Sequence, residues 1–230
     1  MNRSQLMDVP HCVNDTEFVR QIAFHEAGHA TAIHIRNTQE KLPPIYFQIY
    51  INHAYHWRRD VSNTYEHDNS YLTKIENGRL IHTLPCSVAK ALSDFTQLQK
   101  YQYQLAFEAD IVNLLAGPLS EANYVALRDN EPLSPRIVNL DALHYYGGSS
   151  DLATINEYID CLELSSDQRK AKITALFLKT FAFIKDSNNW RSILALAEYI
   201  ISSNKSIIDY ADIASVLDNQ FFVAKTQSWY

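Results

Sequence analysis

The chain has 230 residues, of which 47% are hydrophobic and 20% are charged, and its formal net charge is −6. This length and composition are typical of one globular domain, which we expect to span residues 1–230. The negative net charge gives no electrostatic footprint for nucleic acid or for an anionic membrane, so neither is an expected partner.

The beginning of the chain contains no apolar run of the kind that forms a signal peptide, and we expect residues 1–13 to form an N-terminal arm. No stretch is long and apolar enough to cross a bilayer. Cys12, Cys86 and Cys161 are far apart and form no metal-binding pair. These features predict a soluble, cytoplasmic protein with free thiols.

The first expected element is a helix over residues 18–37. Asn14 and Glu17 have the spacing of a capping box at its beginning, and Asn37 is the expected end. Apolar residues recur along it at helical spacing (Phe18, Ile22, Ala30 and Ile33). No proline interrupts this stretch.

This helix contains the pattern His-Glu-x-x-His, at His25, Glu26 and His29. Histidines four residues apart lie one above the other on a helix, where they can share a metal ion. In zinc-dependent hydrolases with this pattern, the histidines bind zinc and the glutamate takes a proton from water as general base. The small residues Ala27 and Gly28 would let another backbone approach closely. The alternative is a chance match in which the histidines are ordinary core residues.

After this helix we expect a strand over residues 45–51, central in a small sheet, because the run is rich in β-branched and aromatic residues. A hairpin is expected from residues 71–75 and 79–83, around an Asn77-Gly78 turn. The segment between them holds three histidines whose spacing matches no metal-binding pattern, and we expect a solvated loop there (His53, His56 and His67).

The rest of the sequence has helical periodicity. A long helical stretch is expected from Ser87 up to about Leu127, with a kink or a division at Gly117-Pro118. A loop of unusual length, residues 129–148, precedes a helix that begins at residues 149–151, where either serine could cap. Three more helices are expected, over residues 167–185, 189–203 and 206–217. The predicted fold class is mainly α with a small β-sheet (α+β).

A catalytic zinc site needs a third protein ligand and an open position for water. The extended pattern with a third histidine ten residues after the first is excluded, because Ile35 stands there. His34 is turned to the far side of the helix from His25. The ligand must therefore come from a distant segment, where the candidates are Glu108, Glu121, His144 and Asp151. Asp151 has the best setting because it opens a helix after a Gly-Gly-Ser-Ser turn, although aspartate is common in first helical turns for its interaction with the helix dipole.

Three blocks of the sequence resemble the peptidase domain of FtsH-type AAA zinc metalloproteases. Residues 25–30 read His-Glu-Ala-Gly-His-Ala, which is that domain's signature. Residues 114–121 resemble its Gly-Gly-Arg-x-Ala-Glu helix, and residues 147–152 resemble its Gly-Ala-Ser-Asn-Asp segment, whose aspartate is the third zinc ligand. Residues 190–217 resemble its closing helices. The resemblance implies a zincin-like motif helix with a C-terminal helical bundle, and zinc held by His25, His29 and Asp151.

The chain also departs from that family. No ATPase module and no membrane helix precede the motif, and the loop of residues 129–148 is longer than the family's. Pro118 stands where the middle block has arginine, Ala116 where it has its first glycine, and Ser150 where the last block has asparagine. The chain therefore resembles a stand-alone peptidase domain.

The resemblance implies a zinc metalloendopeptidase with Glu26 as general base. Because no ATPase module precedes the motif, we expect it to need no ATP and to cleave peptides or unfolded proteins. Glu121 could orient a histidine ligand through its other ring nitrogen, or form a salt bridge on a helix surface. One alternative is an inactive binding or scaffold module that keeps the fold, and another is hydrolysis of a non-peptide amide. A homo-oligomer and a separate motor partner are both left open.

Overall fold

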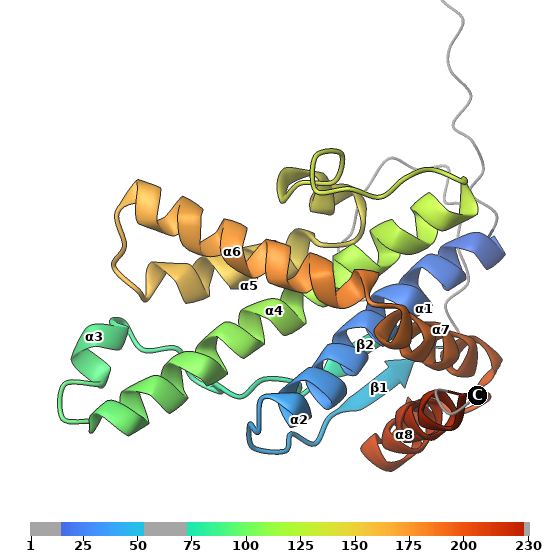
Figure 1. Ribbon diagram of the computed structural model, residues 1–230, viewed down its shortest axis with the longest axis horizontal. Coiled ribbons are helices and arrows are strands. Elements are labelled where there is room, and N and C mark those ends of the chain that lie inside the picture. Colours follow the sequence, from blue (N-terminus) through green and yellow to red (C-terminus); the bar gives the residue numbers. More distant parts are fainter. Residues whose placement is uncertain (1–14, 53–72, 228–230) are drawn as a thin grey trace, which may run out of the picture.

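A computed structural model describes residues 15–52 and 73–227 of the chain (Figure 1). Several sequence-based predictions lie outside these residues. They concern the N-terminal arm, the capping residue Asn14, Cys12 and the loop with three histidines (His53, His56 and His67).

Helices make up most of the described chain. The helix predicted around the His-Glu-x-x-His pattern is present as α1 (Asp15–Thr31), the π-helical segment η1 (Ala32–Arg36) and the short α2 (Asn37–Gln39). The later helical segments are α3 (Val88–Ala91), α4 (Gln97–Arg128), the 3-10 helix η2 (Asp141–Tyr145), α5 (Ser149–Asp160), α6 (Ser166–Lys185), α7 (Ser187–Ser202) and α8 (Tyr210–Gln227). Together with a small sheet, they confirm the predicted class, mainly α with some β.

The sheet has three short antiparallel strands in the order β2-β1-β3. They are β1 (Gln48–Ile51), β2 (Thr73–Glu76) and β3 (Ile207–Ile208). The predicted strand over residues 45–51 is therefore confirmed as the central one, although it is shorter. Strand β2 lies at one edge, paired with β1 from Gln48↔Glu76 to Ile51↔Thr73.

The predicted hairpin of residues 71–75 and 79–83 is wrong. The chain does turn at Asn77, which has a φ of 68°. Beyond it, however, the backbone N–H groups of Leu80 and Ile81 donate to the buried carboxylate of Asp110 at 2.8 Å each. These donors bind a side chain of α4, so residues 79–83 form no strand and β2 pairs with β1 instead.

Three other helical predictions need correction. Helix α4 is not divided at Gly117-Pro118, since Pro118 lies inside one continuous helix. No serine caps α5, because Gly148 is the residue before it and no side chain makes the capping hydrogen bond. The helix predicted over residues 206–217 begins only at Tyr210, because the preceding isoleucines form β3 against β1.

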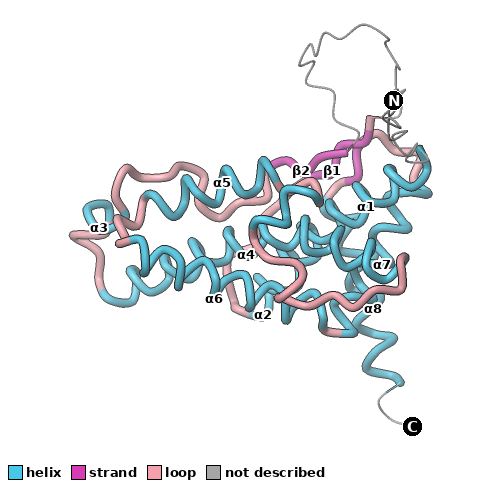
Figure 2. The backbone as a smooth tube through the Cα atoms, turned by 90° about the horizontal axis from the view of Figure 1, so that it is seen from above, coloured by secondary structure: helices cyan, strands magenta, loops and turns pink. Residues whose placement is uncertain are grey.

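Helix α1 lies at the centre of the packing, in contact with α4, α7 and strand β2. Figure 2 shows the strands together at one edge of the helical body. Phe24 of α1 stacks on Tyr124 of α4, with ring centroids 4.2 Å apart, and on Trp190 of α7 at 5.6 Å. A Cβ atom at Gly28 would collide with Ser120 and with the backbone of α4. The close approach predicted from small residues at this position is therefore confirmed.

The described helices and cysteines can be compared with the predictions of no membrane span and of free thiols. No helix within residues 15–52 and 73–227 has the length and apolar character needed to cross a membrane. Cys86 is exposed, Cys161 is buried, and neither forms a disulfide. The cytoplasmic location stays a prediction.

Candidate metal centre

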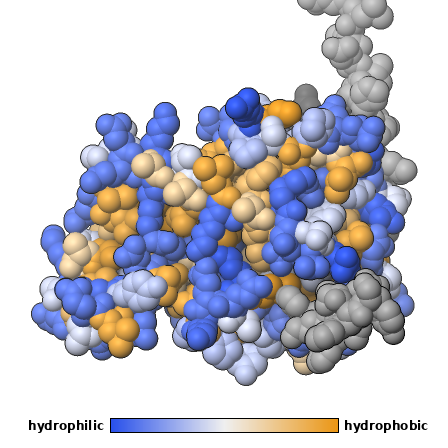
Figure 3. All heavy atoms as spheres, viewed as in Figure 1, coloured by the Kyte–Doolittle hydropathy of each residue, from blue (hydrophilic) through white to orange (hydrophobic). Residues whose placement is uncertain are grey.

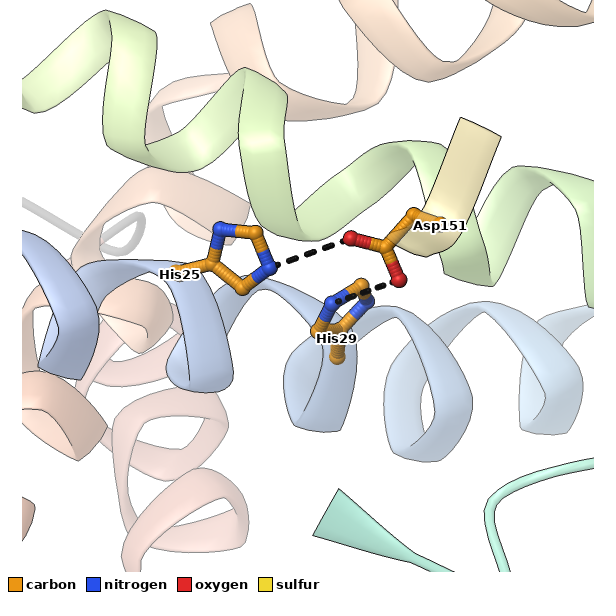
Figure 4. Close-up of side chains that lie close together, drawn as sticks. All are labelled: His25, His29 and Asp151. Carbon is orange, nitrogen blue, oxygen red and sulfur yellow. Dashed lines mark ion pairs between the residues drawn. The ribbon is translucent and has the colours of Figure 1, made fainter. Parts of the chain in front are cut away.

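Side chains from two helices converge at the middle of α1. His25 and His29 lie on one face of α1, and Asp151 reaches them from the first turn of α5 (Figure 4). His25 Nε2 is 3.2 Å from Asp151 Oδ2, and His29 Nε2 is 3.6 Å from Asp151 Oδ1. One ligand atom of each residue lies within 4.8 Å of the others. Among the described residues, only this group has the composition and spacing of a metal site.

The structure separates Asp151 from the other candidate ligands. Glu108 contacts Lys172, at 2.5 Å, and Gln104. The exposed His144 lies with Nδ1 3.2 Å from Ser149 Oγ. His34 points away from the centre, as predicted, toward Tyr210 and Asp218. The sequence alone left these possibilities open, and among the candidates only Asp151 faces the Nε2 atoms of both histidines.

Each histidine is oriented through its Nδ1 atom. The buried Glu121 accepts from His25 Nδ1 across 3.1 Å, and the backbone carbonyl of Asn113 accepts from His29 Nδ1 across 2.8 Å. Both Nε2 atoms are therefore directed to Asp151, as a shared metal ion would require. Glu121 does contact a histidine, so the surface salt bridge considered for it is wrong. The sequence did not predict the contact of Asn113 with His29, because every residue has a backbone carbonyl and the residue type therefore does not reveal which one is used.

Two glycines keep the space around the histidine rings, and the sequence analysis assigned neither to the site. A Cβ atom at Gly117 would collide with the imidazole of His29. Gly147 has a φ of 68°, and a Cβ atom there would lie 3.1 Å from His25 Nδ1 and 3.0 Å from Glu121 Oε2. Glycine thus suits residue 147 both by conformation and by space.

The contact at Gly117 leads to a testable prediction. In Gly117→Ala, the new methyl group should displace the His29 ring and lower zinc affinity by at least tenfold, a loss of the size seen when the support of a ligand is removed. The fold should persist, because alanine favours a helix by about 1 kcal/mol over glycine. Competition with a chromophoric chelator measures the affinity. Ala126→Gly, a small-residue change in the same helix, is the control, and equal affinities in all three proteins would contradict the prediction.

The residues fit a zinc ion. Asp151 Oδ2 is buried and has no hydrogen bond of its own, and its nearest charged neighbour is His25 Nε2 at 3.2 Å. A buried carboxylate oxygen without a partner is costly unless a cation is bound. Zn²⁺ bound tetrahedrally at about 2.0–2.1 Å places neighbouring donor atoms roughly 3.3 Å apart. The two nitrogen–oxygen pairs here, at 3.2 and 3.6 Å, end on different oxygens of Asp151, and the ligand atoms of the group lie within 4.8 Å of one another, so a small closure would bring them onto one ion. Two imidazoles and one carboxylate also leave a fourth position open.

Comparisons of the chain with protein-family models, with curated proteins and with solved structures found no match. The resemblance to FtsH-type peptidases therefore stays a prediction, as do the bound metal and the role of each residue. The geometry of the centre and of its surroundings carries the functional proposal.

The electrostatics of the centre follow from burial and from the nearby carboxylates. Burial lowers the pKa of His25, but Asp151 and Glu121 outweigh it and raise this pKa to about 10. Burial also lowers the pKa of His29, and here the lowering prevails. The pKa of Asp151 is raised by burial but lowered overall by the histidines. Without metal, His25 is therefore protonated between two carboxylates, and His29 is neutral.

Zinc binding should consequently release a proton. His25 must be neutral to bind a metal, so below pH 10 the ion displaces its proton. We expect about one proton per zinc at pH 8, and an affinity that rises about tenfold per pH unit toward pH 10. An indicator dye in weakly buffered solution measures the release. A zinc titration that binds one equivalent and releases no proton at pH 8 would show that His25 is already neutral.

The centre opens into a cleft of about 480 Å³ between α1, β2, α4 and α5. Glu26 lies on its wall and is 8% exposed. Burial raises the pKa of Glu26 to about 7, although the nearby backbone N–H of Ile75 in β2 acts to lower it. A group with a pKa near neutrality is suited to accept and return a proton. Glu26 thus lines the same cleft as the group of His25, His29 and Asp151 and as the edge strand β2.

Proposed function

We propose that the chain is a zinc-dependent metallopeptidase that cleaves flexible peptide segments. The observation that carries this proposal is the arrangement of one cleft, which combines His25, His29 and Asp151 with a buried carboxylate, Glu26, that is not a member of the group. A zinc ion held by the three residues would supply a Lewis acid that activates water and polarises a carbonyl. A purely structural site would have no use for a base.

The proton transfers fall to Glu26. Its carboxylate takes a proton from the attacking water and then gives it to the nitrogen of the departing amine. Its buried position keeps bulk water from competing for that proton. The nearby backbone N–H of Ile75 favours the ionised carboxylate, the form that accepts a proton. Glu121 and the carbonyl of Asn113 act one step further out, by holding the two imidazoles in place.

We infer the class of substrate from strand β2. Strand β2 lines the cleft and is an edge strand, paired only with β1 among the described residues. An exposed edge offers backbone groups to an extended peptide, which can add to the sheet as a further strand. Apolar side chains beside it could receive those of the peptide (Ile33, Ile75 and Leu114). Only an unfolded segment can lie in this way, and such a segment needs no ATP-driven unfolding.

Hydrolysis of casein, an unstructured protein, tests the proposal. With zinc and without ATP, the purified chain should release peptides, and a chelator should abolish this release until zinc is restored. A stably folded protein of similar size, as the matched substrate, should stay intact. Cleavage that persists in chelator would contradict the proposal. Stoichiometric zinc binding with no cleavage of any peptide would instead support the binding or scaffold alternative.

A further inference from the structure

A second pocket lies at the other end of α4 from the metal centre. It has a volume of about 490 Å³ and lies between α3, the first half of α4, the turn after α5 and the beginning of α6. We call it the α3–α4 pocket. Lys100 on its wall is 17 residues from Gly117, which is a distance of about 26 Å along the helix axis. The proposed peptidase activity does not involve it.

The walls of the α3–α4 pocket are mainly apolar. Leu92 and Phe107 are almost fully buried, and the half-buried Leu162 and Leu164 face them from the turn after α5. In Figure 3, hydrophobic atoms show between hydrophilic ones at the left end of the molecule, where α3 and the beginning of α4 lie. The volume is within the range of about 300–1,000 Å³ typical of small-molecule sites. A ligand for this pocket therefore has an apolar body.

The charged residues of the pocket indicate which polar group the ligand carries. Lys172 is paired with Glu108 at 2.5 Å, and Gln104 also donates to this carboxylate. Burial alone would raise the pKa of Glu108, but these partners lower it overall, so the pair is ionic and neutralised. Lys100 is half-buried and makes no ion pair within residues 15–52 and 73–227. One positive charge is thus uncompensated beside an apolar cavity.

We propose that the α3–α4 pocket binds a small amphipathic monocarboxylate, of the class of a medium-chain fatty acid. Its alkyl chain lies against Leu92 and Phe107, and its carboxylate pairs with Lys100. A neutral apolar molecule would leave the lysine without a partner. A second anionic group would find no further unpaired cation among the described residues of the pocket wall, because Lys172 is already paired with Glu108. The ligand therefore carries one negative charge at one end of an apolar chain.

Equilibrium dialysis with radiolabelled decanoate tests the assignment. The full chain should bind one decanoate in a saturable manner. Lys100→Gln should weaken this binding by about tenfold, because a hydrogen bond to a charged group is lost. Lys90→Gln is the matched control: Lys90 is an exposed neighbour on α3 outside the pocket, and its loss should change nothing. Decanol, with the same chain and no charge, should bind Lys100→Gln and the wild type equally.

A second variant tests the place of the alkyl chain. Ala89 is exposed and lines the pocket, so Ala89→Phe should fold normally while its ring fills part of the cavity. Binding of both decanoate and decanol should then fall by at least tenfold. Circular dichroism checks that each variant is folded. Non-saturable uptake, equal decanoate binding by wild type and Lys100→Gln, or unchanged binding by Ala89→Phe would each overturn the proposal.

Discussion

Glu26→Gln should lower the rate of casein hydrolysis by about a hundred- to ten-thousandfold, the usual contribution of a general base. Glutamine has nearly the same shape but cannot accept the proton of water. Zinc content should stay close to that of the wild type, because Glu26 is not a member of the group of His25, His29 and Asp151. Initial rates of peptide release and zinc content by atomic absorption together measure both effects.

Glu76→Gln is a matched control for this experiment. Glu76 also lines the cleft, but it belongs to β2 and pairs with Lys74 at the strand surface. The same chemical change there should leave the rate within a few-fold of the wild type. Hydrolysis at the wild-type rate by Glu26→Gln would remove Glu26 from the mechanism. A loss of zinc in that variant would mean that its carboxylate supports the metal centre instead.

Asp151→Ala should reduce zinc affinity by more than the ten- to hundredfold that follows the loss of a group supporting a ligand. The variant loses the only carboxylate in the group and leaves two neutral imidazoles from one helix. Asp151→Asn should fall between alanine and the wild type, because an amide oxygen still reaches the site but carries no charge. Competition with a chromophoric chelator gives the affinity of each folded variant.

Alanine variants at three other residues provide the zinc affinities with which that of Asp151→Ala is compared. Glu121→Ala should lower zinc affinity by ten- to hundredfold, since Glu121 only orients His25. Glu108→Ala and His144→Ala should have little effect, because these residues contact Lys172 and Ser149 away from the centre. Full zinc occupancy in a well-folded Asp151→Ala protein would overturn both the ligand assignment and the resemblance that implied it.

The sequence was most informative where interactions are local. The helix around His25 and His29, the strand at Ile49 and the start of α6 follow from periodicity, residue type and nearby capping side chains. The hairpin failed because its outcome depends on Asp110, which lies about thirty residues further along the chain. A turn signal at Asn77 specifies a change of direction, but not which strand the following residues meet.

The metal centre was predictable only in part, for the same reason. Spacing on one helix gave His25, Glu26 and His29, whereas residue types alone could not rank Asp151 above the other candidates. The glycine at residue 117 was interpreted as a helix breaker, because neither composition nor periodicity reveals which ring it will contact. In the structure, the imidazole of His29 occupies the space that a side chain at Gly117 would need.

The residues of the metal centre come from distant parts of the chain, with the histidines on α1 and the aspartate on α5. An unfolded chain cannot offer them together, so the proposed zinc ion would bind almost only to the native state. Such binding adds RT ln(1 + [Zn]/Kd) to the free energy of unfolding, about 2.7 kcal/mol when free zinc is a hundred times Kd. The midpoint of thermal unfolding should therefore rise with buffered free zinc. Where zinc is scarce, a larger fraction of the molecules would be unfolded and open to proteolysis.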